Sequence, residues 1–166
     1  MSVAFPACSV ARFSRKRASV GVEPGVIGGS ELEYIARCSD SDARDAIALL
    51  HHSVRNTANG SADRVTGAVI DDSKPDADQA VVRSRLSDLS CDQRLVLEVM
   101  ADVHPATSGG VYEAYCEHAD NPVHDRTLRG WLPELERYEL IVKSGSEYEP
   151  IYEVREIALK ELEIMV

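Results

Sequence analysis

The spacing of apolar residues in this chain of 166 residues predicts a mainly α-helical fold in two parts. Apolar side chains recur every three or four positions through most of the sequence, which is the period of one helix face. Only residues 140–143 and 150–154 have the composition of β-strands, and the polar residues 144–147 between them favour a tight turn. We therefore expect a small helical bundle, followed by a second helical domain that ends in a short β-hairpin.

The chain divides into three segments. Residues 1–20 have no apolar period and hold four basic residues and no acid, so we expect no fixed structure there. They lack the apolar block of about 7 to 15 residues of a secretory signal, and no run approaches the roughly 18 residues of a membrane span, which favours a soluble, cytoplasmic protein. Residues 21–88 are predicted to form the bundle and residues 89–166 the second domain.

Four helices are expected in the bundle. Ser30 and Glu33 have the spacing of a capping box, so the first helix should begin at Ser30. The polar run that ends at Asp42 should stop this helix and start the second. Thr66 is a candidate cap for a shorter third helix, and Pro75 is a candidate first residue for a fourth.

The second domain has the element order of a winged helix-turn-helix, namely two helices, a longer third helix and a hairpin. Ser90 and Gln93 form a capping box before the first helix, and Thr107 or Ser108 should start the second. The third helix is expected over residues 124–139, and a closing helix is expected over residues 155–166, after the hairpin. In such domains the third helix lies in a DNA groove, so we expect double-stranded DNA as a partner.

The third helix should present basic side chains to that DNA. Its core side consists of Leu128, Trp131, Leu132 and Leu135. The candidate DNA-binding residues are Arg126, Arg129 and Arg137 on the helix and Lys143 on the first strand. Arginine and lysine suit this role because they contact phosphates and guanine. Pro133 removes one helical hydrogen bond and can kink the axis, which would change the direction of Arg137.

The charge balance opposes DNA binding. Residues 86–166 hold 17 acidic and 7 basic residues, whereas phosphate contacts need basic ones. Three acids of the third helix, Asp125, Glu134 and Glu136, can pair with its arginines. The acidic excess and the preference for arginine, 14 against 4 lysines, are similar to proteins of salt-loving cells, where molar salt screens charges beyond about 3 Å.

Several short stretches, in this order, carry a resemblance to a known family. They are Tyr-Ile-Ala-Arg at 34–37, Ser-Asp-Ala-Arg-Asp-Ala-Ile-Ala-Leu-Leu at 41–50, Arg-Val-Thr at 64–66, Gln-Arg-Leu-Val-Leu at 93–97, Leu-Pro-Glu-Leu at 132–135 and Leu-Ile at 140–141. They resemble the lid and winged-helix domain of archaeal origin-recognition and cell-division-control replication initiators, a branch of the AAA+ ATPases. The resemblance covers residues 20–154 and implies a haloarchaeal, initiator-like protein that binds origin DNA.

The resemblance also implies a nucleotide-sensing role for Arg44, because the family's second-sensor arginine follows an Asp-Ala pair and approaches the nucleotide phosphates. The sequence contains no G-x-x-x-x-G-K-[ST] loop to hold those phosphates. We therefore expect no enzyme activity and no ATP or Mg²⁺ bound by this chain alone. The chain looks like the carboxyl-terminal part of an initiator without its ATPase core, and Arg44 is then a solvated helix residue.

The expected wing departs from the family pattern. Glu147 and Glu149 flank Tyr148, and only Lys143 is basic, so phosphate repulsion would oppose insertion into a groove. Glu139 stands before the strand where the family commonly has glycine. Two other functions remain open: a protein-interaction module that docks on a full-length initiator, and a winged-helix transcription regulator.

No metal or redox site is expected. Cys8, Cys38, Cys91 and Cys116 are scattered without paired spacing, which indicates reduced and mostly buried side chains. His51 and His52 are adjacent on a helix and point about 100° apart, so they cannot share a metal without distortion.

Overall fold

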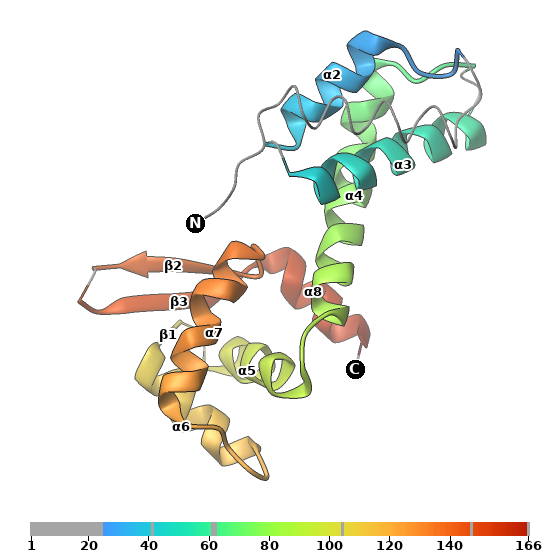
Figure 1. The fold of residues 1–166 in the computed structure, drawn as a ribbon. Helices are drawn as coiled ribbons and strands as arrows, with labels where there is room; N and C mark the ends of the chain where they lie inside the picture. The colour runs from blue at the N-terminus through green and yellow to red at the C-terminus, as the bar shows by residue number, and fades with distance from the viewer. Residues whose placement is uncertain (1–24, 41, 61–62, 104, 147, 166) are drawn as a thin grey trace. The chain divides into compact units, whose positions relative to one another are not determined.

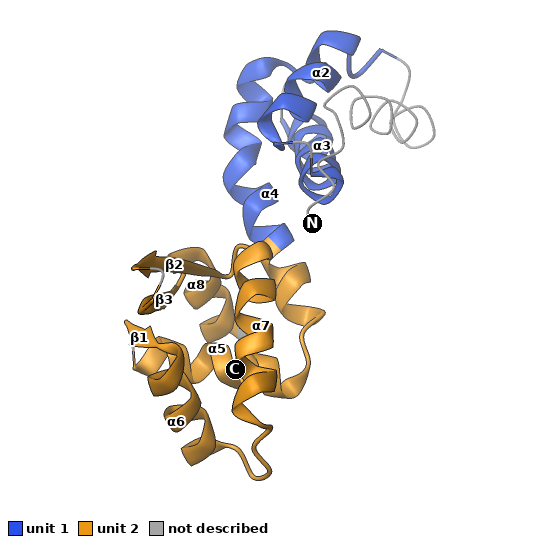
Figure 2. Ribbon diagram, turned by 60° about the vertical axis from the view of Figure 1, so that its left-hand side comes forward, with its two compact units in different colours: residues 1–81 blue, residues 82–166 orange. Residues whose placement is uncertain are grey.

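The computed structural model describes residues 25–40, 42–60, 63–103, 105–146 and 148–165. The chain forms two compact units, Met1–Val81 and Val82–Val166, coloured separately in Figure 2. The boundary between them lies within a single helix, α4 (Gly67–Ser87), seven residues before the boundary predicted after residue 88. Each unit has its own hydrophobic core. The expected segment 1–20 lies outside the described residues.

Unit 1 is built from α2 (Gly29–Cys38), α3 (Ala43–Asn59) and the first turns of α4 (Figure 1). Asp42 caps α3 as expected, because its carboxylate accepts from the backbone amides of Arg44 and Asp45. The inward face of each helix supplies the core of this unit, which includes Leu32, Ile35, Ala46, Leu49, Leu50, Ile70 and Ala77.

The capping box predicted at the start of α2 is wrong. The helix begins at Gly29, and Gly28 is the N-cap in an extended conformation with φ −92° and ψ 173°. The carbonyl of Gly28 accepts from the Leu32 amide at 3.2 Å, so Ser30 lies inside the first turn and not at the capping position. The Ser30 hydroxyl instead donates to the neighbouring Glu31 carboxylate at 2.9 Å.

The two helices predicted around Pro75 are one helix of 21 residues. Thr66 accepts from the Val69 amide at 3.4 Å, as a cap should, but Pro75 lies in the helix interior. Ile70 and Ala77, on either side of the proline, are both buried in the core of unit 1. An interior proline costs about 3 kcal/mol, and the continuous apolar face offsets that cost by burying both halves.

Unit 2 is mainly helical with a small sheet, as predicted, and its elements follow the order of a winged helix-turn-helix (Figure 1). Its helices are α5 (Cys91–Asp102), α6 (Ser108–His118), α7 (Asp125–Arg137) and α8 (Glu156–Met165), and its strands are β1 (Ala106–Thr107), β2 (Ile141–Gly145) and β3 (Pro150–Val154). The sheet is antiparallel in the order β1-β3-β2. Strand β1 was not expected from the sequence.

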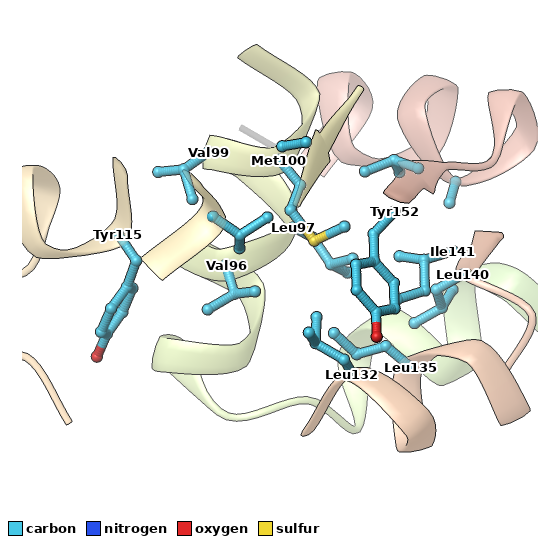
Figure 3. Close-up of a cluster of buried hydrophobic side chains, with 14 of the residues drawn as sticks. Val96, Leu97, Val99, Met100, Tyr115, Leu132, Leu135, Leu140, Ile141 and Tyr152 are labelled. Atoms are coloured by element: carbon cyan, nitrogen blue, oxygen red, sulfur yellow. The ribbon is translucent and has the colours of Figure 1, made fainter. Parts of the chain in front are cut away.

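The predicted starts of α5 and α6 are confirmed. Ser90 and Gln93 form the reciprocal capping box, and the Thr107 hydroxyl accepts from the Gly110 amide. Between these helices, Tyr115 is fully buried at the edge of the apolar cluster drawn in Figure 3. Its hydroxyl donates to the Asp92 carboxylate at 3.0 Å and accepts from the Val123 amide at 3.3 Å. Burial is the main cause of the raised pKa of this phenol.

Within unit 2, the end of α4 is held by an ion pair between a half-exposed arginine and a buried carboxylate. Arg83 donates from Nε to the Glu161 carboxylate of α8 at 2.7 Å, and the Glu161 side chain is 0% exposed. The apolar side chains of Val82 and Leu86 on the same turns belong to the core of unit 2. The last turns of α4 are therefore part of this unit's fold.

The chain reverses after α7 through a left-handed residue that is not glycine. Glu139 has φ +56°, and the amides of Glu139 and Leu140 donate to the carbonyls of Glu136 and Leu135. This is the Schellman arrangement, whose left-handed position is usually glycine. Glutamate therefore occupies the position that is usually glycine, and α7 still ends in the Schellman arrangement.

Two arginines hold the Glu139 carboxylate. Arg85, only 6% exposed, donates to it at 3.3 Å and to the Tyr138 carbonyl at 3.0 Å. Arg155 donates to the same carboxylate and to the Glu139 carbonyl, both at 3.3 Å. These contacts offset the cost of about 1 kcal/mol or more for a left-handed residue with a Cβ.

Glu139→Gly is expected to be more stable than Glu139→Ala by about 1 kcal/mol, because both variants lose the carboxylate and only glycine relieves the left-handed strain. Urea unfolding followed by the fluorescence of Trp131, the one tryptophan of the sequence and a residue of unit 2, measures the difference. Equal stabilities would show that the turn relaxes when the carboxylate is removed.

Tyr115→Phe is expected to destabilise unit 2 by about 1 to 3 kcal/mol, because it removes a hydrogen bond to a carboxylate and leaves the Val123 amide without this acceptor. The same unfolding measurement tests it. Tyr148→Phe is the matched control, since Tyr148 is 96% exposed and its change should stay within about 0.5 kcal/mol. An equally small effect at Tyr115 would contradict the assignment.

Candidate nucleic-acid interface

Helix α7 has a buried side and a solvent side, as the sequence predicted. Leu128, Leu132 and Leu135 are buried in the core of unit 2, whereas Trp131 is only partly buried at its edge. The solvent side carries exposed residues three or four positions apart, which we call the α7 stripe: Arg126, Arg129, Gly130, Pro133 and Arg137. All three arginines predicted to bind DNA therefore lie on one face.

The centre of the α7 stripe has little side-chain bulk. A Cβ built on Gly130 meets no atom within 4 Å, so packing does not require glycine at this position. Glycine in a helix interior costs about 1 kcal/mol relative to alanine. Pro133 does not end the helix, which continues to Arg137, but it removes the amide donor that the Arg129 carbonyl would have. A partner can therefore approach the helix backbone between the arginines.

Two of the three arginines are paired with acids of the same helix, as the sequence indicated. Arg129 donates from Nε to Asp125 Oδ1 at 2.9 Å, and this hydrogen bond raises the guanidinium pKa. Arg137 lies 3.7 Å from Glu134 Oε1 and 5.2 Å from the centre of the Tyr138 ring. Within the described part of the chain, the Arg126 side chain has no hydrogen bond or ion pair.

Lys143 lies on the hairpin beside α7. It is exposed on β2, opposite Tyr152 of β3, and β2 packs against α7. Tyr152 points from β3 toward Leu132 and Leu135 of α7 (Figure 3), and it is close enough to Arg129 to affect the guanidinium pKa. Lys143 thus lies on the strand that packs against α7; the hairpin was expected from the sequence, whereas its register was not.

The tip of the hairpin is polar and acidic, as expected. Tyr148 and Glu149 are exposed, and the Glu149 amide donates to the Ser146 hydroxyl at 3.0 Å. Glu147 lies outside the described residues. Lys143 is the one basic residue among the described residues of the hairpin, and it lies on the strand, away from the tip.

Arg44 belongs to unit 1 and not to this interface. It is exposed in the first turn of α3, where its amide donates to the Asp42 carboxylate at 2.7 Å. Its expected role toward a nucleotide stays a prediction. His52, about two turns further along α3, has a lowered pKa, caused first by burial and then by His51.

The described cysteines are more exposed than the sequence predicted. Cys91 is exposed and Cys38 and Cys116 are partly buried, so the expectation of mostly buried cysteines is wrong for the described ones, and Cys8 lies outside them. Within the described ranges, no group of three histidine, cysteine or acidic side chains could hold a metal ion. No described helix has the length and apolarity needed to cross a membrane.

Sequence reasoning missed two residues of the interface. Gly130 was overlooked, although glycine in the middle of an amphipathic helix was a visible signal. The contribution of Tyr152 had no such signal, because it depends on the register between β2 and β3.

No protein-family profile matches the chain. ORC1-type DNA replication protein 9 of Halobacterium salinarum is 28% identical over 130 residues, which are 78% of this chain and 37% of that protein. ORC1-type DNA replication protein 1 of the same organism is 28% identical over 109 residues, 66% of this chain and 35% of that protein. The chain thus spans little more than a third of these relatives.

The Aeropyrum pernix ORC1 protein, solved in complex with DNA, has the same fold. Its structure matches with a TM-score of 0.67 at 21% identity, over 96% of this chain and 47% of that one. The fold expected from the resemblance is therefore confirmed. By its sequence the chain is homologous to ORC1-type DNA replication proteins.

Proposed function

We propose that this chain is a replication-initiator-like protein that binds duplex DNA, as in origin recognition, through α7 and the β2–β3 hairpin. The observation that carries the proposal is the α7 stripe, in which arginines lie on both sides of the small residues Gly130 and Pro133. Homology to ORC1-type replication proteins supports it, and so does the shared fold of the A. pernix protein, whose structure includes DNA.

The stripe suits the major groove of DNA. That groove is about 12 Å wide and admits a helix of about 10 to 12 Å diameter. Because Gly130 has no side chain, the helix axis can lie deeper in the groove than it could with a larger residue there. Arg126 and Lys143 supply phosphate contacts, and Arg129 is directed at the base edges.

The carboxylates beside the arginines of α7 should lower the affinity for DNA. Arg129 and Arg137 are each paired with a carboxylate, so part of their charge is already balanced. Exposed pairs of this kind contribute little to the fold, so DNA can displace Glu134 from Arg137 at small cost, while Arg129 can keep its bond to Asp125 and still offer its terminal nitrogens. Non-specific binding to DNA should therefore be weak, and the affinity should depend on contacts in the groove.

We infer that the chain acts without hydrolysing ATP itself. The sequence contains no G-x-x-x-x-G-K-[ST] loop to hold the nucleotide phosphates. Arg44 would then approach a nucleotide only if another chain supplied it. DNA binding through unit 2 needs no nucleotide in this proposal.

Arg126→Ala combined with Arg129→Ala is expected to weaken duplex binding at least about tenfold. Each lost phosphate contact should also reduce the slope of log affinity against log salt by about 0.9. Fluorescence anisotropy with a labelled duplex over a salt series measures both. Arg37→Ala with Arg55→Ala removes the same charge from exposed positions in unit 1 and should change little. Unchanged binding by the α7 double variant would refute the proposed interface.

The variants Gly130→Leu and Gly130→Ala distinguish an effect on DNA binding from an effect on folding. Both should stabilise α7, by up to about 1 kcal/mol, because no atom obstructs the new side chain and helix propensity improves. Only leucine is large enough to hold the helix away from a groove, so it should weaken DNA binding about tenfold or more, with alanine close to the parent chain. Tight binding by the leucine variant would exclude the stripe as the contact surface.

A further inference from the structure

The Asp125–Arg129 pair does more than balance charge. We propose that Asp125 is a positioning residue for sequence recognition: it holds the Arg129 guanidinium so that its two terminal nitrogens contact one guanine in the major groove. This inference rests on the proposed binding of duplex DNA by α7. Beyond DNA binding as such, the pair would give the protein a preference for guanine at one position, through Arg129.

The hydrogen bond between the two residues uses one edge of the guanidinium. Arg129 donates from Nε to Asp125 Oδ1 at 2.9 Å. Among the residues that the structure describes, neither Nη1 nor Nη2 has a hydrogen-bond acceptor. Two parallel donors of this kind match the O6 and N7 acceptors of guanine, which is the commonest specific contact of arginine in the major groove.

Asp125 is itself held in place. It is the first residue of α7, directly after the N-cap His124. The His124 ring accepts from the Arg126 amide at 3.2 Å, and the His124 carbonyl accepts from the Thr127 amide at 2.8 Å, so the backbone around Asp125 is fixed. A carboxylate in the first turn is favoured by the helix dipole, and the order acid before base at i and i+4 is the better one.

The carboxylate of the pair is less exposed to solvent than the guanidinium. The Asp125 side chain is 33% exposed and that of Arg129 is 55% exposed, so the carboxylate lies further inside while the guanidinium extends toward solvent. A free arginine side chain loses much rotamer entropy when it binds, and the pair removes part of that freedom before DNA arrives. Arg126, which lacks such a partner among the described residues, suits a phosphate contact that tolerates several geometries.

Positioning and simple neutralisation predict different results when the carboxylate is removed. If Asp125 only balanced charge, Asp125→Ala would raise affinity for every duplex equally. If it positions Arg129, the same variant loses preference for one base pair, whatever happens to overall affinity. Glu136 is the matched control, because it is an exposed acid two turns after Arg129 on the same helix. Glu136→Ala changes the net charge equally and leaves the pair intact.

The experiment selects duplexes from a random library with the full chain and with Asp125→Ala, Arg129→Ala and Glu136→Ala, after circular dichroism has shown that each is folded. The parent chain and Glu136→Ala should select the same guanine. Asp125→Ala and Arg129→Ala should both lose that preference, by about tenfold in relative affinity for the selected duplex and its G-to-A variant.

Two results overturn the inference while leaving the proposed function intact: retention of the guanine preference by Asp125→Ala, or its retention by Arg129→Ala. Equal gains in affinity for all duplexes in both acidic variants would identify the pair as charge balance alone. If the parent chain enriches no duplex at all, the proposed function fails together with this inference.

Discussion

The left-handed turn at Glu139 is the constraint on which the geometry of unit 2 depends. It ends α7, starts β2 and fixes their relation, because the Leu140 amide is bound to α7 and the Leu140 carbonyl accepts from the Arg155 amide after β3. Arg85 brings the end of α4 to the same point. This reversal, together with the pairing of β2 with β3, fixes where β2 and Lys143 lie relative to α7.

The proposed contact with DNA and the fold make opposite demands on the same helix. The fold needs three buried leucines and gains from acids that pair with arginines, whereas a DNA partner needs those arginines available. The α7 stripe meets both demands by giving up helix stability at Gly130 and Pro133, where larger residues or better helix formers would fit. Low helix propensity at exposed positions is expected where side chains are selected for contact with a partner and not for the stability of the helix.

Sequence reasoning predicted features that depend on a few neighbouring residues. The starts of α5 and α6 followed from Ser90 and Thr107, because a capping side chain and its amide lie within three residues. The fold class followed from the apolar period. Interior Pro75 was misjudged because burial of Ile70 and Ala77, which keeps the helix continuous, is a tertiary effect. Strand β1 exists only because β3 is brought beside it.

The continuity of α4 across the two units decides how the chain can be dissected. A fragment that began at residue 89, where the sequence suggested a boundary, would discard Val82 and Leu86 from the core of unit 2. It would also remove Arg83 from a carboxylate that solvent does not reach. The unit that can be exchanged between relatives is therefore larger than the winged helix alone: a cut before residue 82 keeps Arg83 with Glu161 and also keeps Val82 and Leu86 in the core.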